Sequence, residues 1–132
     1  MTKTRFKQRF ENFEKAYHLL EKTVKKTSLS ELERGGMIQF FEISFELAWK
    51  MLKDYLESEG YTVDSPRDAL KQGFQINLIE NGHVWMQALE DRNLTTHTYD
   101  EKTSLKVEKM IRETYFPAVK QLYDTLKQKT TA

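Results

Sequence analysis

The chain has 132 residues, of which 39% are hydrophobic and 12% aromatic, so it has enough apolar side chains for a folded core. It contains no cysteine, which excludes disulfides, thiolate catalysis and cysteine-based zinc sites and is typical of a reducing cytosol. The net charge is +1, but residues 1–34 carry +4, residues 35–100 carry −6 and residues 101–132 carry +3.

The sequence contains neither a recognisable signal peptide nor a candidate membrane-spanning segment. Residues 1–7 contain no apolar run of the kind found in signal peptides, and no window approaches about 18 uncharged apolar residues. We therefore expect a cytoplasmic protein with no membrane partner. A nucleic-acid partner would meet basic side chains mainly at the two ends of the chain, because the middle is acidic.

A helical seam runs through the first part of the chain. Aromatic and aliphatic residues recur there at steps of four and three, with charged residues between them. This spacing predicts an amphipathic helix over residues 4–26. The seam consists of Phe6, Phe10, Phe13, Tyr17, Leu20 and Val24.

A second helix is predicted over residues 31–59. Ser30 and Glu33 form a capping-box pattern at its start, and Gly60 is a favourable residue just past its end. Its apolar residues form two adjacent seams rather than one. So broadly apolar a helix is either central in a bundle or shared between the bundle and a partner.

Two short helices follow. Ser65 as N-cap and Pro66 at the first helical position predict a helix that ends near the turn at residues 80–82. The next helix is predicted over residues 83–96, and Trp85 is expected to anchor it in the core.

The last helix is predicted over residues 100–129. Pro117 falls inside it, so we expect a kink near residues 113–116 rather than a break. No segment alternates with a period of two. The sequence therefore predicts an all-α, antiparallel up-and-down helical bundle with no β-sheet. We expect a four-helix-bundle core with an extra short helix, in one domain over residues 1–132.

The run R-N-L-T-T-H-T-Y at residues 92–99 holds the side chains best suited to chemistry. On a helix, Asn93 and His97 lie one turn apart on the same face, and Arg92 is one step round from them. Arg92 offers a permanent cation, and His97 offers a group that titrates near neutral pH. Charge neutralisation and proton transfer are what phosphodiester cleavage needs when no metal takes part.

A purely structural interpretation of the same run stays open. Arg92 would then pair with a nearby acid such as Asp91 or Glu90, and His97 would cap the end of its helix. An arginine and a histidine at this spacing also occur together by chance, so the spacing alone does not decide between the two interpretations.

The remaining histidines favour no second site. His18 lies among glutamates off the apolar seam and His83 follows a turn, so we expect both at the surface. The sequence has no metal-binding spacing of His, Asp or Glu and no glycine-rich phosphate loop. We therefore expect neither a metal nor another cofactor.

With its surroundings, the run at residues 92–99 resembles the R-x4-H-x-Y signature of the HEPN superfamily. Within that superfamily the chain is similar to the nucleotidyltransferase substrate-binding proteins, a group that includes the HepT-like toxins of HEPN/MNT toxin–antitoxin pairs. The similarity extends along nearly the whole chain and is carried by residues 32–34, 40–42, 45–50, 65–67, 85 and 89–99.

The resemblance implies a homodimer of helical bundles in which two copies of the motif face one cleft. It also implies a metal-independent ribonuclease in which Arg92 and His97 are catalytic. His97 would transfer a proton to or from a ribose 2′-hydroxyl or the leaving oxygen, and Arg92 would stabilise the charge of the phosphorane. Asn93 and Thr96 would bind the substrate.

The same resemblance implies a protein partner, a small nucleotidyltransferase of the MNT type that adds AMP to the motif tyrosine, here Tyr99. The added anion would block the cleft and compete with RNA for Arg92. The first functional hypothesis is therefore an endoribonuclease toxin neutralised by this partner. The alternative is a non-catalytic subunit that binds nucleotide or substrate for a two-component nucleotidyltransferase.

Overall fold

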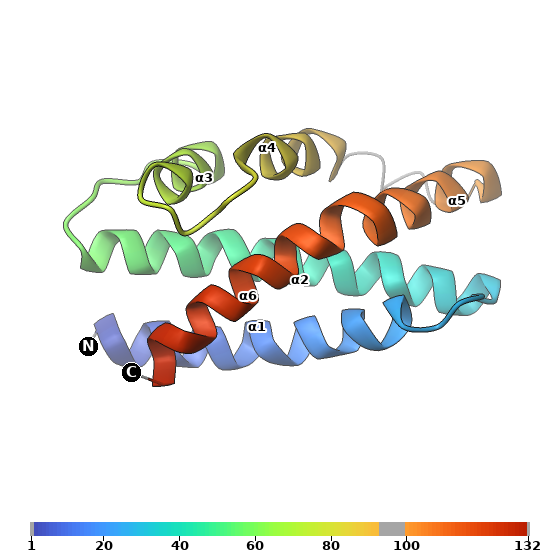
Figure 1. Ribbon diagram of the computed structural model, residues 1–132, viewed down its shortest axis with the longest axis horizontal. Coiled ribbons are helices and arrows are strands. Elements are labelled where there is room, and N and C mark those ends of the chain that lie inside the picture. Colours follow the sequence, from blue (N-terminus) through green and yellow to red (C-terminus); the bar gives the residue numbers. More distant parts are fainter. Residues whose placement is uncertain (1, 93–99, 132) are drawn as a thin grey trace.

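The computed structural model describes residues 2–92 and 100–131, and within these ranges it contains helices and loops but no strand. The prediction of an all-α fold is thereby confirmed. The elements, labelled as in Figure 1, are α1 (Thr2–Val24), α2 (Glu31–Ser58), α3 (Pro66–Gln75), α4 (Gly82–Asp91), α5 (Glu101–Met110) and α6 (Phe116–Thr131).

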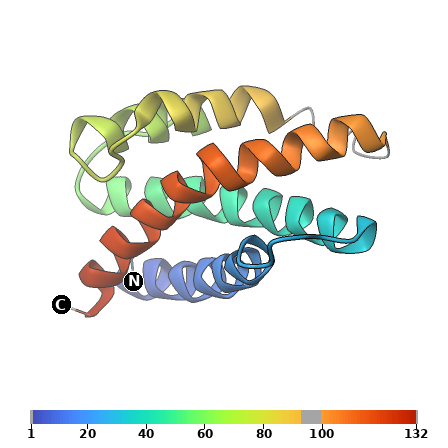
Figure 2. The same cartoon turned by 45° about the vertical axis from the view of Figure 1, so that its right-hand side comes forward.

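The helices form a bundle around α2. Helices α1 and α2 lie antiparallel and pack side by side along most of their length (Figure 1). Helices α5 and α6 follow one another in a nearly continuous rod, with α5 against α2 and α6 crossing α1. Helices α3 and α4 lie together on the side of α2 away from α1, as Figure 2 also shows. The start of α1 and the end of α6 lie at the same end of the bundle.

The core is rich in aromatic rings where α6 crosses α1. Tyr17 stacks on Tyr123 with ring centroids 4.2 Å apart, and Phe116 stacks on the same Tyr17 at 5.6 Å. The hydroxyl of Tyr123 donates to Glu14 at 2.5 Å, and the ammonium of Lys127 donates to the same carboxylate at 2.7 Å. The hydrogen bonds from Lys127 and then Tyr123 lower the pKa of Glu14 below its usual value.

The predicted helix starts are confirmed where they depend on neighbouring residues. The side chain of Ser30 accepts from the backbone N–H of Glu33, and the Glu33 side chain accepts from the N–H of Ser30, which completes the capping box. Ser65 caps α3 by accepting from the N–H of Asp68 at 3.1 Å. Gly60 follows α2 with a φ of +94°, a conformation that glycine adopts without strain.

The end of α3 was predicted wrongly, whereas residues 93–96, at the predicted end of the next helix, lie outside the described residues. Helix α3 ends at Gln75, five residues before the turn at residues 80–82 that was expected to end it. Asn77 has a φ of +66°, which takes the chain out of the helix, and the carbonyl of Gly73 accepts from the N–H groups of Leu78 and Ile79. Leu78 and Ile79 are then buried in the core, which ties this turn to the body of the protein.

The predicted disturbance near Pro117 takes the form of a π turn. Residues Ile111–Tyr115 adopt π-helical hydrogen bonding between α5 and α6, directly before the proline. Proline lacks the N–H that an α-helix requires, and its ring clashes with the preceding turn, whereas single π turns do occur within α-helices. The backbone therefore continues as a helix through this point.

Helix α2 buries one of its two apolar seams completely and exposes the middle of the other. Ile38, Phe41, Phe45, Ala48 and Leu52 are all at most 3% exposed. In the second seam Met37 and Met51 are buried, whereas Ile43 is 41% exposed. Helix α2 is thus the central helix of the bundle, with a short apolar strip left at the surface.

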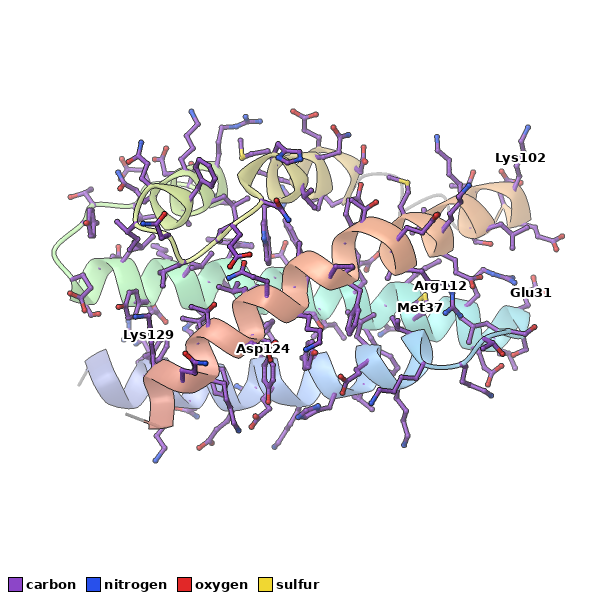
Figure 3. All side chains as sticks on the ribbon, in the orientation of Figure 1. Glu31, Met37, Lys102, Arg112, Asp124 and Lys129 are labelled. Atoms are coloured by element: carbon purple, nitrogen blue, oxygen red, sulfur yellow. The ribbon has the colours of Figure 1, made fainter. Side chains whose placement is uncertain are left out.

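An arginine cluster closes one end of the bundle. Glu108 of α5 accepts from Arg34 of α2 at 2.7 Å and from Arg112 of the π turn at 2.8 Å. Arg112 also donates to the carbonyls of Val24 and Lys26, between α1 and α2, at 2.8 and 2.7 Å. Figure 3 shows Arg112 beside the connection that leads into α2. We call Arg34, Glu108 and Arg112 the end clasp.

Desolvation and hydrogen bonding act on Glu108 in opposite directions. Burial raises the pKa of Glu108, but the hydrogen bonds from Arg34 and Arg112 outweigh it, so the net pKa is lowered. The charged carboxylate is therefore the form that holds the end clasp together.

No helix within the described ranges combines the length and the apolar character that crossing a lipid bilayer requires.

Candidate functional site

Helix α4 leads into the R-x4-H run and is fixed to the bundle by Trp85. The indole of Trp85 is 1% exposed and stacks on Phe45 of α2 with centroids 5.7 Å apart. Ala88 is buried one turn further along the same face. Trp85 is thus the core anchor that the sequence predicted. The opposite face of α4 remains open to solvent at residues such as His83 and Gln87.

A second anchor lies at the last residue of α4. The buried hydroxyl of Tyr115, in the π turn, donates to the carboxylate of Asp91 at 2.5 Å. The side-chain amide of Gln87 donates to the same carboxylate at 3.1 Å. Burial and then the Asp91 hydrogen bond raise the pKa of Tyr115 above its usual range, so the phenol remains a donor. The contact with Tyr115 therefore ties the end of α4, just before Arg92, to the π turn.

Arg92 extends from this anchored helix end toward α2. Its guanidinium donates to Glu46 Oε1 at 3.3 Å, while Glu46 Oε2 accepts from the indole N–H of Trp49 at 3.0 Å. The side chains of Arg92 and Glu46 are 47% and 43% exposed, so both remain in contact with water. Arg92 does pair with an acid, as the structural interpretation required, but the acid comes from α2 rather than from Asp91 or Glu90.

Arg92 also borders an open groove between α3 and α4. The groove has a volume of about 380 Å³. Its lining combines two guanidinium groups with a hydroxyl, a carboxylate and apolar surface, from Ser65, Pro66, Arg67, Leu89, Glu90 and Arg92. Groups of this kind are suited to binding an anionic ligand that also has an apolar part.

The other predicted site residues lie outside the described part of the chain. These are Asn93, Thr96, His97 and Tyr99. Arg92 is thus the predicted site residue whose surroundings are known, and it lies at the surface beside a groove. The histidines that were expected at the surface, His18 and His83, are both exposed. Within the described ranges, no group of three or more metal-ligating side chains gathers.

The sequence did not predict the contacts that position Arg92 and the end of α4. Glu46 and Trp49 are three residues apart on α2, a spacing at which side chains meet on a helix, so their contact was predictable. The contacts of Glu46 with Arg92 and of Asp91 with Tyr115 join residues far apart in the chain. Patterns of neighbouring residues in the sequence therefore could not predict these two contacts.

The amino-acid sequence matches a family model and a curated protein. A family model described as nucleotidyltransferase substrate binding protein like matches residues 8–128. A Haemophilus influenzae protein named probable ribonuclease HepT is 32% identical over 78 residues, which cover 55% of this chain and 53% of that protein. The match thus spans about half the length of this curated relative.

A solved structure has the same fold. The crystal structure of a protein from Thermus thermophilus superposes with a TM-score of 0.75 and 29% sequence identity, covering 91% of this chain and 99% of the other. Both the helical fold and the family predicted from the R-x4-H-x-Y signature are therefore confirmed. This chain belongs to the nucleotidyltransferase substrate binding protein like family, among the HepT-like proteins of the HEPN type.

Proposed function

We propose that this protein is a metal-independent endoribonuclease of the HEPN type, acting as the toxin of a toxin–antitoxin pair. The observation that carries the proposal is the position of Arg92, half exposed beside an open groove and directly after Asp91, which Tyr115 anchors. The name of the Haemophilus influenzae relative, probable ribonuclease HepT, supports the same reaction class.

The proposed reaction is an internal transesterification of RNA. His97 accepts the proton of a ribose 2′-hydroxyl, and the 2′-oxygen forms a bond to the adjacent phosphorus. The bond from phosphorus to the 5′-oxygen breaks, and that oxygen receives the proton back from the protonated His97, which leaves a 2′,3′-cyclic phosphate and a 5′-hydroxyl. Arg92 stabilises the negative charge of the phosphorane, which is the interaction that strengthens most in the transition state. Asn93 and Thr96 orient the phosphate.

The ion pair between Arg92 and Glu46 is compatible with this role because it is weak. Pairs between exposed side chains are typically worth about 0–1 kcal/mol. A phosphate accepting two hydrogen bonds from the same guanidinium gains more than that. Glu46 thus holds Arg92 near its working position without preventing substrate from taking its place.

A homodimer would supply a second copy of Arg92 and His97 to one cleft. Its partner protein is proposed to be a small nucleotidyltransferase that transfers AMP from ATP to the phenol of Tyr99, with release of pyrophosphate and of the phenolic proton. Tyr99 lies seven residues after Arg92 in the sequence. The phosphate of an AMP group on Tyr99 would compete with RNA for the Arg92 guanidinium.

The decisive experiment compares purified native protein with His97→Ala on single-stranded RNA in the presence of EDTA. We expect cleavage by the native protein and none by the variant, because the proton-transfer group is lost. His83→Ala is the matched control, since it removes an exposed histidine of α4 and should cleave like the native protein. Cleavage at native rate by His97→Ala would reject the proposal.

The family description favours a second candidate, a non-catalytic subunit that binds nucleotide or substrate for a nucleotidyltransferase. In that case the pure protein cleaves no RNA but binds nucleotide and increases turnover by its partner. Intact mass after incubation with the partner and ATP separates the two. Gain of AMP on Tyr99, absent in Tyr99→Phe and accompanied by loss of RNA cleavage, supports the toxin.

A further inference from the structure

The groove between α3 and α4 contains a cation that the proposed reaction does not use. Arg67 lies at the start of α3, is exposed, and borders the same groove as Arg92. Within the described part of the chain its guanidinium makes no ion pair or hydrogen bond. Arg9, Arg34, Arg92 and Arg112, by contrast, each pair with a carboxylate.

A hydroxyl donor lies next to this arginine. The oxygen of Ser65 accepts from the N–H of Asp68 at 3.1 Å, which uses a lone pair and leaves the hydroxyl hydrogen available. Leu89, on the facing helix, adds apolar surface to the groove. The groove therefore offers a charged donor, a neutral donor and an adjoining apolar surface.

The charge of the groove limits the ligand. Arg67 and Arg92 contribute two positive charges, and Glu90 contributes one negative charge. Two successive phosphodiesters of one strand, each with a single negative charge, can each pair with one of the two arginines, whereas the several charges of a triphosphate would be repelled by Glu90. Net attraction to each phosphodiester of a strand is the property that a single-stranded RNA path requires.

We propose that this groove binds the phosphodiester next to the scissile one in a single-stranded RNA, with Arg67 as its cation and Ser65 as a second donor. The inference rests on the proposed ribonuclease function. Arg92 then contacts the reacting phosphate and Arg67 its neighbour, so Arg67 contributes to the binding of longer substrates and not to the chemical step.

The test measures RNA binding in the His97→Ala background, which prevents cleavage during the experiment. Fluorescence anisotropy gives the dissociation constants of a dinucleotide and a six-nucleotide single strand over a range of salt concentrations.

Arg67→Ala is expected to weaken binding of the six-nucleotide strand about tenfold, as for removal of one charge-assisted hydrogen bond. It should also reduce the slope of log affinity against log salt by about 0.7, the value expected for each phosphate of a single strand that a cation neutralises. Binding of the dinucleotide should not change.

Lys71→Ala is the matched control. Lys71 is an exposed cation of the same helix, so Lys71→Ala changes the net charge of the protein by the same amount as Arg67→Ala. Because Lys71 does not line the groove, this variant should bind RNA like the parent protein. Arg67→Lys keeps the charge without the planar fork and should recover part of the lost affinity. Neither variant of Arg67 should alter thermal unfolding, because the guanidinium makes no ion pair or hydrogen bond within the described residues.

The outcomes separate this inference from the function on which it rests. If the native protein cleaves RNA but Arg67→Ala binds the six-nucleotide strand like Lys71→Ala, the groove is no RNA subsite and the ribonuclease proposal stands. If Arg67→Ala weakens binding of AMP or ATP but not of RNA, the RNA assignment is wrong. If the native protein neither binds nor cleaves RNA, both proposals fall.

Discussion

Two arginine–carboxylate sites in this protein have the same chemistry and opposite properties. In the end clasp, the side chains of Arg34 and Glu108 are 13% and 15% exposed, and Arg112 also donates to two backbone carbonyls. At the end of α4, Arg92 and Glu46 are 47% and 43% exposed and share one hydrogen bond of 3.3 Å.

The difference shows that solvent exposure determines whether an arginine–carboxylate pair is suited to a structural or a functional role. In the end clasp, the carboxylate and both guanidinium groups are largely removed from water, so loss of any partner leaves a poorly solvated charge behind. At the end of α4, water replaces a lost partner at little cost. The first site is therefore suited to holding helices together, and the second to exchanging one anion for another.

The largest effect is expected for Arg92→Ala on RNA cleavage. Loss of the group that stabilises the transition-state charge should lower the cleavage rate by about 10²–10³-fold. The midpoint of urea unfolding should stay close to that of the native protein, because the ion pair with Glu46 is exposed and contributes little to stability. Arg5→Ala, another exposed arginine, should leave the rate unchanged. A rate loss that merely follows unfolding of Arg92→Ala would contradict the functional assignment.

Glu108→Gln tests the other side of the comparison. It keeps the shape of the side chain but leaves two partly buried guanidinium groups without a counter-charge, so we expect the free energy of unfolding to fall by about 2–3 kcal/mol. Urea unfolding followed by circular dichroism measures this change. Glu113→Gln, which changes an exposed glutamate of the neighbouring π turn, should have little effect. Equal loss in both variants would show that the end clasp contributes nothing specific.

Acid should lower the free energy of unfolding through two carboxylates, Glu108 of the end clasp and Glu14 of α1. The pKa values of Glu108 and Glu14 are lower in the folded protein than the usual 4.5, so the unfolded chain binds more protons at mildly acidic pH. Stability from these groups is complete above pH values near 4.5 and is lost as the pH falls through their folded pKa values. The unfolding free energy should therefore be flat from neutral pH to mild acid and then decrease. A Glu108→Gln variant should show a shallower decrease, and an unchanged acid slope would contradict the assignment.

The smallest effect is expected for Glu46→Gln. The variant loses an exposed ion pair, so the unfolding free energy should change by less than about 1 kcal/mol. RNA binding in the His97→Ala background should become up to about fivefold tighter, since the competing carboxylate is removed. Glu42→Gln, one turn earlier on α2, serves as control. Weaker RNA binding by Glu46→Gln would show instead that Glu46 is needed to position Arg92.

Local features were predictable because they depend on residues close in the chain. The capping box at Ser30, the start of α3 at Ser65 and the disturbance before Pro117 each arise from interactions within a few residues. The end of α3 was missed because it depends on burial of Leu78 and Ile79 in a core that other helices supply.

By itself the sequence determined the helical class, most helix starts and the family, since apolar periodicity, capping residues and the R-x4-H-x-Y signature are all local. Only the tertiary structure decided that Tyr115 fixes Asp91, that Glu46 holds Arg92 and that Arg67 borders the same groove as Arg92. These contacts join helices that are distant in the chain. Their geometry is set by how the helices pack, and helix packing depends on the whole core rather than on any single segment.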